Sequence, residues 1–114
     1  MPFIRTTTTE TITKEKAEIL KEKLGCAIAL IPGKSEAYLM LEFKGDAAMA
    51  FRGDSTTPLA MVEVQLLGSA SVEYLDALNK RVTEILTDTL GVPKDRIYIN
   101  FSHYERWGSG GELF

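Results

Sequence analysis

Hydrophobic residues along the chain follow two different periods, and the first change of period separates a strand from a helix. Residues 2–8 are rich in β-branched and aromatic side chains, which is typical of a strand, and proline suits its first position because it has no ladder hydrogen bond to give. From Thr13, an N-cap residue type, apolar residues recur at steps of three and four up to Pro32-Gly33, which predicts an amphipathic helix. We expect Cys26, beside the apolar stripe of this helix, to be a small buried side chain.

The same order of elements recurs in the rest of the chain. Apolar and aromatic runs predict further main strands at 37–43, 59–66 and 96–101. Between the last two strands, residues 71–90 carry apolar positions with helical spacing and are expected to form a second amphipathic helix. In the loop before the third main strand, residues 48–51 are predicted to form a short edge strand.

The two halves of the chain also resemble each other. Each half opens a strand with proline, Pro2 or Pro58, and runs through a helix and a glycine to a strand that carries a tyrosine, Tyr38 or Tyr98. Such a duplicated β-α-β unit predicts a four-stranded mixed sheet with two helices on one face, an α+β (α/β) fold. At 114 residues we expect a single domain that spans 1–114.

Apolar side chains occupy both faces of several predicted strands. In the first strand Ile4 points opposite to Phe3, and in the second Leu41 points opposite to Met40. The chain has no spare helix to cover the second face of the sheet, so we expect another copy of the chain to cover it.

Composition and charge narrow the classes of function. The net charge is −3 and the 13 basic residues are scattered, so the sequence has no electrostatic footprint for nucleic acid. No apolar run approaches the roughly 20 residues of a membrane span, and the start lacks the pattern of a signal peptide, so a cytoplasmic protein is expected. The single cysteine and the single histidine, Cys26 and His103, exclude a disulfide within the chain and a zinc site of cysteines and histidines.

The start of the chain, Met1-Pro2, carries candidate chemistry. Removal of Met1 before a proline would leave a secondary amine as the first atom of a strand, and such an amine is a base that no side chain can imitate. A general base works best when its pKa is near the working pH, so burial or a nearby positive charge must lower the pKa of this amine. Met-Pro starts are common, and these two residues alone indicate only that Met1 is removed.

Short motifs spread over nearly the full length of the chain carry a family resemblance. The motifs are Met1-Pro2; Gly33-Lys34 with Tyr38; Met49-Ala50-Phe51 with Gly53, Ser55 and Pro58; Leu67-Gly68; Asp95 to Asn100; and Trp107-Gly108 with Phe114. In this order and spacing the chain resembles the tautomerase superfamily, specifically the branch of macrophage migration inhibitory factor and D-dopachrome tautomerase. The resemblance implies a homotrimer of duplicated β-α-β units whose open sheet faces turn inward.

The resemblance also implies an activity and the residues that carry it. The activity is that of a keto–enol tautomerase, in which Pro2 takes a proton from the carbon next to a carbonyl and returns it elsewhere. Lys34 would face the carboxylate or carbonyl oxygen of the substrate and stabilise the enolate, and together with an apolar crevice it would lower the pKa of the Pro2 amine. Leu67 would donate its backbone N–H to the substrate carboxylate, although leucine replaces the commoner isoleucine here.

Further pocket residues follow from the same resemblance. Tyr98 and Asn100 would enter the pocket from the adjacent subunit, and Tyr38, Trp107 and Phe114 would form an aromatic wall around an aryl substrate. The implied substrates are phenylpyruvate-like keto or enol acids and dopachrome-like compounds. No metal or organic cofactor is implied, because the amine is the base.

Two departures from the family pattern bear on function. The Cys-x-x-Cys of some relatives is replaced by Leu59 and Val62, so a thiol oxidoreductase role has no support. The ending after Trp107 also differs, because residues 109–114 read Ser-Gly-Gly-Glu-Leu-Phe. We therefore expect an altered pocket rim, with its own substrate preference.

Two alternatives stand beside the tautomerase interpretation. One is a cytokine-like protein that acts by binding a receptor, with Pro2 as a relic. The other is a ferredoxin-like regulatory domain that binds small ligands between subunits, since two strand-helix-strand units fit that plan too. A domain of the second kind has no need of Pro2 or of Lys34 after the first helix.

Overall fold

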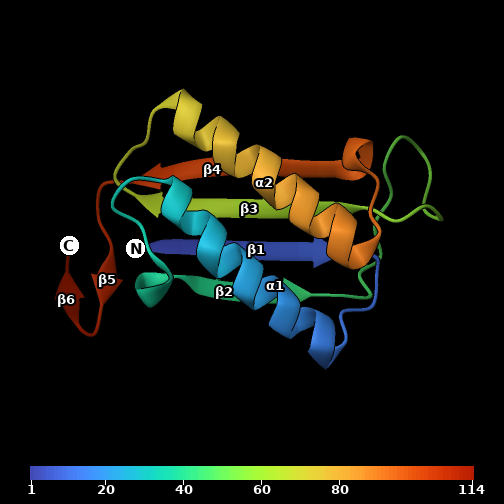
Figure 1. The fold of residues 1–114 in the computed structure, drawn as a ribbon, viewed down its shortest axis with the longest axis horizontal. Helices are drawn as coiled ribbons and strands as arrows, with labels where there is room; N and C mark the ends of the chain where they lie inside the picture. The colour runs from blue at the N-terminus through green and yellow to red at the C-terminus, as the bar shows by residue number, and fades with distance from the viewer.

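A computed structural model describes residues 1–114 as a four-stranded sheet covered on one face by two helices (Figure 1). The elements are β1 (Pro2–Thr8), α1 (Lys14–Ala27), β2 (Met40–Lys44), β3 (Ala60–Leu67), α2 (Val72–Leu90) and β4 (Ile97–Tyr104). The strand order is β2-β1-β3-β4, in which β1–β2 and β3–β4 are parallel and β1–β3 is antiparallel. The predicted mixed sheet, built from two β-α-β units with both helices on one face, is confirmed.

Three short 3₁₀ helices and a small hairpin complete the chain. The 3₁₀ helices are η1 (Ile28–Leu30), η2 (Glu36–Tyr38) and η3 (Lys94–Arg96), and the hairpin joins β5 (Gly108–Ser109) to β6 (Glu112–Leu113). Both residues of the hairpin turn are glycines with positive φ, 60° at Gly110 and 86° at Gly111, which side chains rarely tolerate. The hairpin lies at the end of the sheet where β1 begins, and the loop between β2 and β3 lies at the opposite end (Figure 1).

The core lies between the sheet and the two helices. Alternate residues of β1 and β3 are buried, as expected for strands that turn one face to the core. The largest fully buried side chains are Ile4, Leu20, Leu24, Ile28, Ile31, Val62, Val64, Leu66, Leu78, Val82, Ile85 and Leu86. Each large side chain buried in this way stabilises the fold by roughly 1.5–3 kcal/mol, so both helices are fixed against the strands.

The predicted helices are present, with differences at one end. Thr13 is the N-cap of α1, and its side chain accepts a hydrogen bond from the Lys16 amide at 3.2 Å. The α-helix ends at Ala27 and only η1 continues it, so the predicted end at residues 32–33 was too late. Cys26 is exposed, and its predicted burial was wrong. At about 100° per residue it lies some 200° around the helix from the buried Leu24.

Two predicted strand segments are not strands. Tyr38 lies in η2, because the parallel ladder between β1 and β2 begins only at the pair Phe3–Met40. Before that pair β1 offers only Pro2, which has no N–H to donate. The predicted edge strand at 48–51 is also wrong, since only one isolated bridge, Phe51 to Asp54, forms there.

The open face of the sheet is mixed in character. Phe3 and Met40 lie side by side at one end of it, and Met40 is 67% exposed. In the next row Arg5 forms ion pairs with Glu42 at 2.6 Å and with Glu63 at 3.5 Å. The expected apolar residues are therefore present, but charged groups accompany them, and cover by another copy of the chain stays a prediction.

Two threonines on the buried face of β1 allow a matched stability test. Thr6 and Thr8 are both fully buried, but the Thr6 hydroxyl has no hydrogen-bond partner, whereas the Thr8 hydroxyl donates to the Leu59 carbonyl at 2.8 Å. A buried unpaired hydroxyl costs about 1–3 kcal/mol, so Thr6→Val is expected to raise the free energy of unfolding by about 1 kcal/mol. Thr8→Val should lower it by about 1–2 kcal/mol. Urea denaturation measures both, and equal losses in the two variants would contradict this account.

Candidate functional site

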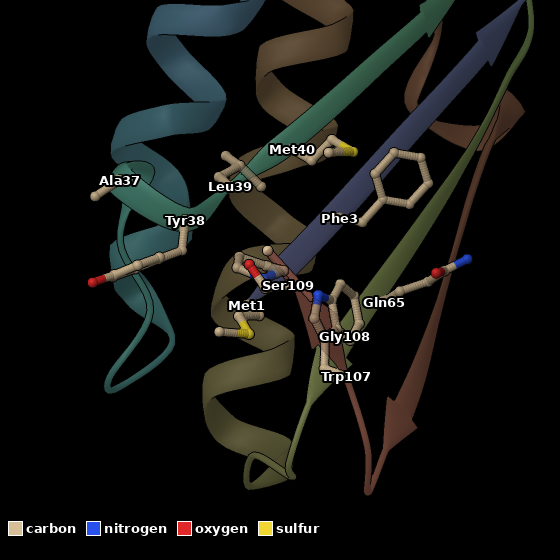
Figure 2. Close-up of a pocket in the computed structure, with 12 residues that line it drawn as sticks. Met1, Phe3, Ala37, Tyr38, Leu39, Met40, Gln65, Trp107, Gly108 and Ser109 are labelled. Carbon is tan, nitrogen blue, oxygen red and sulfur yellow. The ribbon is translucent and has the colours of Figure 1, made fainter. Parts of the chain in front are cut away.

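A cavity of about 750 Å³ lies where β1 begins (Figure 2). Its walls come from the start of β1, from η2 and the start of β2, from β3, and from the C-terminal hairpin. The lining residues are Met1, Pro2, Phe3, Ala37, Tyr38, Leu39, Met40, Gln65, Trp107, Gly108, Ser109 and Gly110. Most of these side chains are apolar, so the cavity suits a ligand with an apolar or aromatic body.

Local sequence explains why this space is not filled. The ladder between β1 and β2 starts late, so η2 turns aside and leaves room between the two strand starts. On the other side, Gly108 and Gly110 bring the hairpin backbone to the cavity without side chains to fill it.

Lys34, Leu67 and Met1 converge at the start of β1. The backbone N–H of Leu67 donates to the Met1 carbonyl at 3.1 Å. The ammonium of Lys34 donates to the Leu67 carbonyl at 2.6 Å, which holds this partly buried side chain beside the N-terminus. Lys34 reaches this place after a tight turn at Gly33, whose φ is +81°. Pro2 itself is buried.

The environment of the N-terminus disfavours positive charge. Burial lowers the pKa of the Met1 amine, and the neighbouring Lys34 ammonium lowers this pKa further. An amine held at this place is therefore neutral, and able to accept a proton, at a lower pH than an ordinary amino group. The amine of Met1, which lines the apolar cavity, thus lies beside the Lys34 ammonium and the Leu67 backbone, although neither Lys34 nor Leu67 lines the cavity. A basic amine beside a positive charge is an arrangement suited to proton abstraction next to an oxyanion.

The predicted aromatic residues are only partly at this cavity. Tyr38 and Trp107 line it, and Tyr38 is 68% exposed. Phe114 does not line it, but its backbone N–H and carbonyl pair with those of Trp107 at 2.8 and 2.9 Å. Phe114 is therefore bonded to a residue of the cavity wall but is not itself part of the wall.

Tyr98 and Asn100 lie elsewhere in the chain. Both are exposed on β4, where Tyr98 pairs in register with Met61. Pro2 pairs with Leu66 of β3, and Leu66 pairs with His103 of β4, so His103 marks the level of Pro2 on β4. Tyr98 lies five residues before His103, about 17 Å away along the strand. Within one chain these two side chains are not part of the cavity at Pro2, and their entry into a neighbouring copy's pocket stays a prediction.

Tyr98 instead lines a second, smaller cavity of about 290 Å³ at the other end of the sheet. Its ring meets the ring of Phe51 edge to face, with 4.9 Å between centroids. Met49 and Met61 are further apolar walls of this cavity, and the buried Arg96 closes one side.

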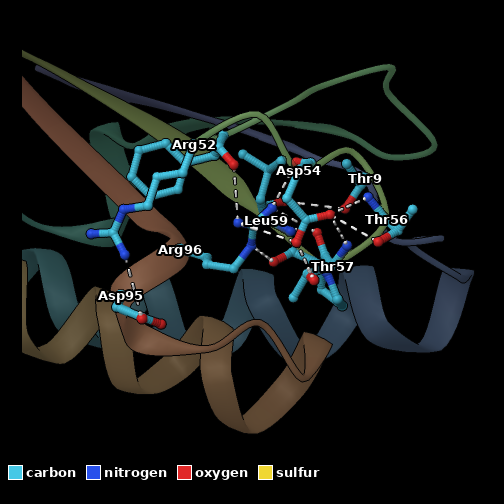
Figure 3. Close-up of polar contacts among 10 residues, drawn as sticks. Thr9, Arg52, Asp54, Thr56, Thr57, Leu59, Asp95 and Arg96 are labelled. Atoms are coloured by element: carbon cyan, nitrogen blue, oxygen red, sulfur yellow. Dashed lines mark hydrogen bonds and ion pairs between the residues drawn. The ribbon is translucent and has the colours of Figure 1, made fainter.

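Arg96 lies within the motif Asp95 to Asn100, but the sequence assigned it no role. In the structure it holds the second region together (Figure 3). It is 8% exposed, and its guanidinium donates hydrogen bonds to four backbone carbonyls and lies 3.8 Å from the Asp54 carboxylate. The four acceptors are those of Pro58 at 3.0 Å, Phe51 at 3.2 Å, Asp54 at 3.1 Å and Thr57 at 3.0 Å. One side chain thereby fixes the loop from 51 to 58 against the sheet, and with it the position of the Phe51 ring.

Asp54 closes the same loop from its own side (Figure 3). Its carboxylate accepts hydrogen bonds from the Thr57 hydroxyl and from the amide and hydroxyl of Thr56. These bonds, that of the Thr57 hydroxyl first, hold the pKa of Asp54 well below its usual range. The carboxylate is satisfied within the loop and is not free to bind a ligand.

Two features are absent from the structure, a cluster of side chains that could hold a metal and a helix that could span a membrane. No group of three or more His, Cys, Asp and Glu side chains is placed to hold a metal ion. Neither helix combines the length and the apolar character that crossing a bilayer requires.

Comparison with known sequences points to one family. The family model of macrophage migration inhibitory factor (MIF) matches residues 1–112. The factor of Xenopus tropicalis is 31% identical over 74 residues, 65% of this chain and 64% of the relative, so the chain aligns with less than two thirds of that relative's length. A homolog from Brugia malayi is 30% identical over 84 residues, 74% of this chain and 72% of the relative.

Comparison with solved structures agrees. The MIF2 crystal structure of Leishmania major matches with a TM-score of 0.93 at 25% identity and covers 100% of this chain and 97% of that chain. The MIF homologue from Prochlorococcus marinus has a TM-score of 0.87 at 27% identity, with 98% of each chain covered. Pt0534, in a crystal structure of the protein inactivated by 2-oxo-3-pentynoate, shares the fold with a TM-score of 0.80 at 22% identity over 96% of this chain and 93% of that chain.

The resemblance carried by the short motifs is thus confirmed over nearly every residue, in sequence and in fold. This chain belongs to the macrophage migration inhibitory factor family of the tautomerase superfamily.

Proposed function

We propose that this protein, once Met1 is removed, is a keto–enol tautomerase of phenylpyruvate-like and dopachrome-like substrates with the Pro2 amine as general base. The observation that carries the proposal is the convergence of the Lys34 ammonium and the Leu67 backbone at the start of β1. Family membership supports the same activity.

The base is the first requirement. A proline amine is more basic than an ordinary α-amino group, whose pKa is about 7.7–8.0, and would be mostly protonated at neutral pH. Burial and Lys34 lower the pKa of the Met1 amine, and Pro2 is buried one residue further along β1. The same two causes would lower the pKa of the freed Pro2 amine toward neutrality, where a general base is most effective.

The second requirement is a place for the substrate's negative charge. The Leu67 N–H that donates to the Met1 carbonyl loses this acceptor when Met1 is removed. It is then free to donate to one carboxylate oxygen of a keto acid. Lys34, held by the Leu67 carbonyl at 2.6 Å, offers its ammonium to the developing enolate oxygen.

With these contacts the proton transfer can be written without any cofactor. The Pro2 nitrogen takes the proton from the carbon next to the carbonyl, and the C–H electron pair becomes the C=C bond of the enolate. The enolate oxygen carries the charge beside Lys34 until the protonated Pro2 amine delivers its proton to that oxygen, which completes the enol and regenerates the neutral amine. In the reverse direction the amine takes the enol proton and returns it to carbon.

The aryl part of the substrate would lie in the apolar cavity. Tyr38 and Trp107 line this cavity. We propose that Phe114, which does not line the cavity but whose backbone pairs with that of Trp107, completes the aromatic wall. In a homotrimer Tyr98 and Asn100 would come from the adjacent subunit. The fold relative Pt0534 was crystallised inactivated by 2-oxo-3-pentynoate, which is a 2-oxo acid, the class proposed here. We further infer a cytoplasmic protein.

The test is the enol–keto conversion of phenylpyruvate by protein whose mass confirms that Met1 is absent. The matched control is the same chain with Met1 retained, made by peptide ligation, in which the Pro2 nitrogen is an amide and cannot act as a base. Met1-trimmed protein is expected to catalyse the conversion. The rate with the protein that retains Met1 is expected to equal the rate in buffer alone. If trimmed protein is inert the proposal fails, and the interpretation as a receptor-binding protein takes its place.

A further inference from the structure

Tyr104, the last residue of β4, does not line the Pro2 cavity but contacts Trp107, which lines it, and Gly68, which follows Leu67. Its carbonyl accepts a hydrogen bond from the Gly68 amide at 2.8 Å, directly after Leu67. Its ring meets the ring of Trp107 edge to face, with 6.0 Å between centroids and 75° between planes. The family motifs in this sequence did not include Tyr104.

The contact between the Tyr104 and Trp107 rings links the hairpin to the sheet. Residues 108–114 are all exposed, and Trp107 before them is half-buried. Both backbone bonds between Trp107 and Phe114 tie the two ends of the hairpin together, so the hairpin moves with Trp107 as one unit. Only Glu105 and Arg106 separate Trp107 from Tyr104, and both are exposed. No other aromatic pair joins the hairpin to the sheet.

Residues of the same hairpin, with Trp107 before it, form a large part of the cavity wall. Trp107, Gly108, Ser109 and Gly110 all line the cavity (Figure 2). A hairpin that swings outward would therefore remove one wall of the space proposed for the aryl group. It would leave Lys34 and the Leu67 backbone in place, because these contacts lie at the start of β1.

We propose that Tyr104 is a positioning residue, whose ring fixes Trp107 and the β5–β6 hairpin as the wall that binds the aryl part of the substrate. The expected change in kinetics rests on the proposed function, whereas the positioning of Trp107 by Tyr104 is independent of it. An edge-to-face pair is worth enough to change an equilibrium about two- to tenfold. Loss of the ring should thus weaken substrate binding and leave proton transfer alone.

The experiment uses Trp107, the only tryptophan of the chain, as its own probe. Acrylamide quenching of Trp107 fluorescence is compared in wild type, Tyr104→Ala and Tyr104→Phe without any substrate. KM, kcat and the pH profile for phenylpyruvate are then measured for the same variants in Met1-trimmed form. Ser102→Ala is the matched control, because it removes only the hydroxyl that donates to the Tyr104 hydroxyl at 3.4 Å.

Tyr104→Ala is expected to raise the exposure of Trp107 to quencher and the KM each about two- to tenfold, with kcat and the acid limb of the pH profile unchanged. Tyr104→Phe, which keeps the ring, and Ser102→Ala should match wild type in every readout. Should Tyr104→Ala fail to fold by circular dichroism, Tyr104→Leu keeps bulk without a ring and takes its place.

Two results would overturn the inference. One is quenching of Trp107 that does not change when the ring is removed. The other is a KM that rises equally in Tyr104→Phe, which would assign the effect to the hydroxyl. If trimmed wild type is inactive, the proposed function fails, while the quenching experiment still decides whether Tyr104 positions Trp107.

Discussion

Met1-trimmed Lys34→Gln protein is expected to tautomerise phenylpyruvate about 10²–10³-fold more slowly than trimmed wild type at neutral pH. Glutamine keeps a hydrogen-bond donor of similar reach but no charge. It can still contact the Leu67 carbonyl, which the Lys34 ammonium now reaches at 2.6 Å. What is lost is the positive charge beside the enolate oxygen, and removal of one such stabilising group typically has an effect of this size.

The same variant should change the pH profile in a defined direction. Lys34 lowers the pKa of the N-terminal amine, so the amine of Lys34→Gln has a higher pKa than that of wild type. Because only the unprotonated amine is a base, the acid limb of kcat/KM moves to higher pH.

The matched control for charge is Lys80→Gln on α2. Lys80 is 73% exposed and pairs with Asp76 at 2.8 Å, far from the proposed chemistry. This control should keep the wild-type rate and the wild-type acid limb. An acid limb that stays in place in Lys34→Gln would show that Lys34 does not tune the base.

Arg96→Met is expected to lower the free energy of unfolding by about 3–5 kcal/mol. The change keeps an apolar stem of similar length and removes the guanidinium that donates to four backbone carbonyls. The Phe51 and Asp54 carbonyls keep the hydrogen bonds that they accept from each other's amides at 3.0 Å, whereas the Thr57 and Pro58 carbonyls lose their donor. Urea denaturation gives the loss directly.

Arg52→Met in the same loop is the control. Arg52 is 67% exposed, and its guanidinium lies 3.9 Å from the Asp95 carboxylate, a surface pair that contributes about 0–1 kcal/mol. Its effect on unfolding should stay below about 1 kcal/mol. Similar losses in both variants would mean that the loop is held by general charge rather than by the hydrogen bonds of Arg96. A lesser consequence of Arg96→Met is that the Phe51 ring loses its fixed position against Tyr98.

The sequence was sufficient for elements in which local pattern and tertiary contacts agree. The predicted strand 2–8 is β1 with the same bounds, and the predicted helix 71–90 is α2 from Val72 to Leu90. The pattern misplaced Tyr38 because the residue types of 37–38 suit a strand, while only the position of the ladder partner decides whether one forms. It also ended the last strand too early, since Ser102 to Tyr104 are held by pairing with β3 rather than by apolar alternation.

The site could be predicted only where side-chain types mark it. The motifs directed attention to Pro2, Lys34 and Leu67. In the structure Lys34 is bonded to Leu67, and Leu67 to Met1, the chain neighbour of Pro2. Tyr104 was missed, because its contact with the Trp107 ring exists only in the folded chain. Arg96 lies within the motif Asp95 to Asn100, but the sequence assigned it no role, because its partners are backbone carbonyls of the loop. Backbone groups are the same at every residue, so such contacts leave no signal in the sequence.

The two ends of the described chain share one end of the sheet (Figure 1), with Met1 in the cavity wall and Phe114 bonded to Trp107. An affinity tag or reporter domain fused to either end would therefore emerge at the mouth of the cavity. A fusion before Met1 would also keep the Pro2 nitrogen acylated, and one after Phe114 would load the hairpin. Labels for this protein belong on the exposed part of the loop between β2 and β3, at the opposite end of the sheet (Figure 1), where a dye or a handle leaves the cavity at the start of β1 open.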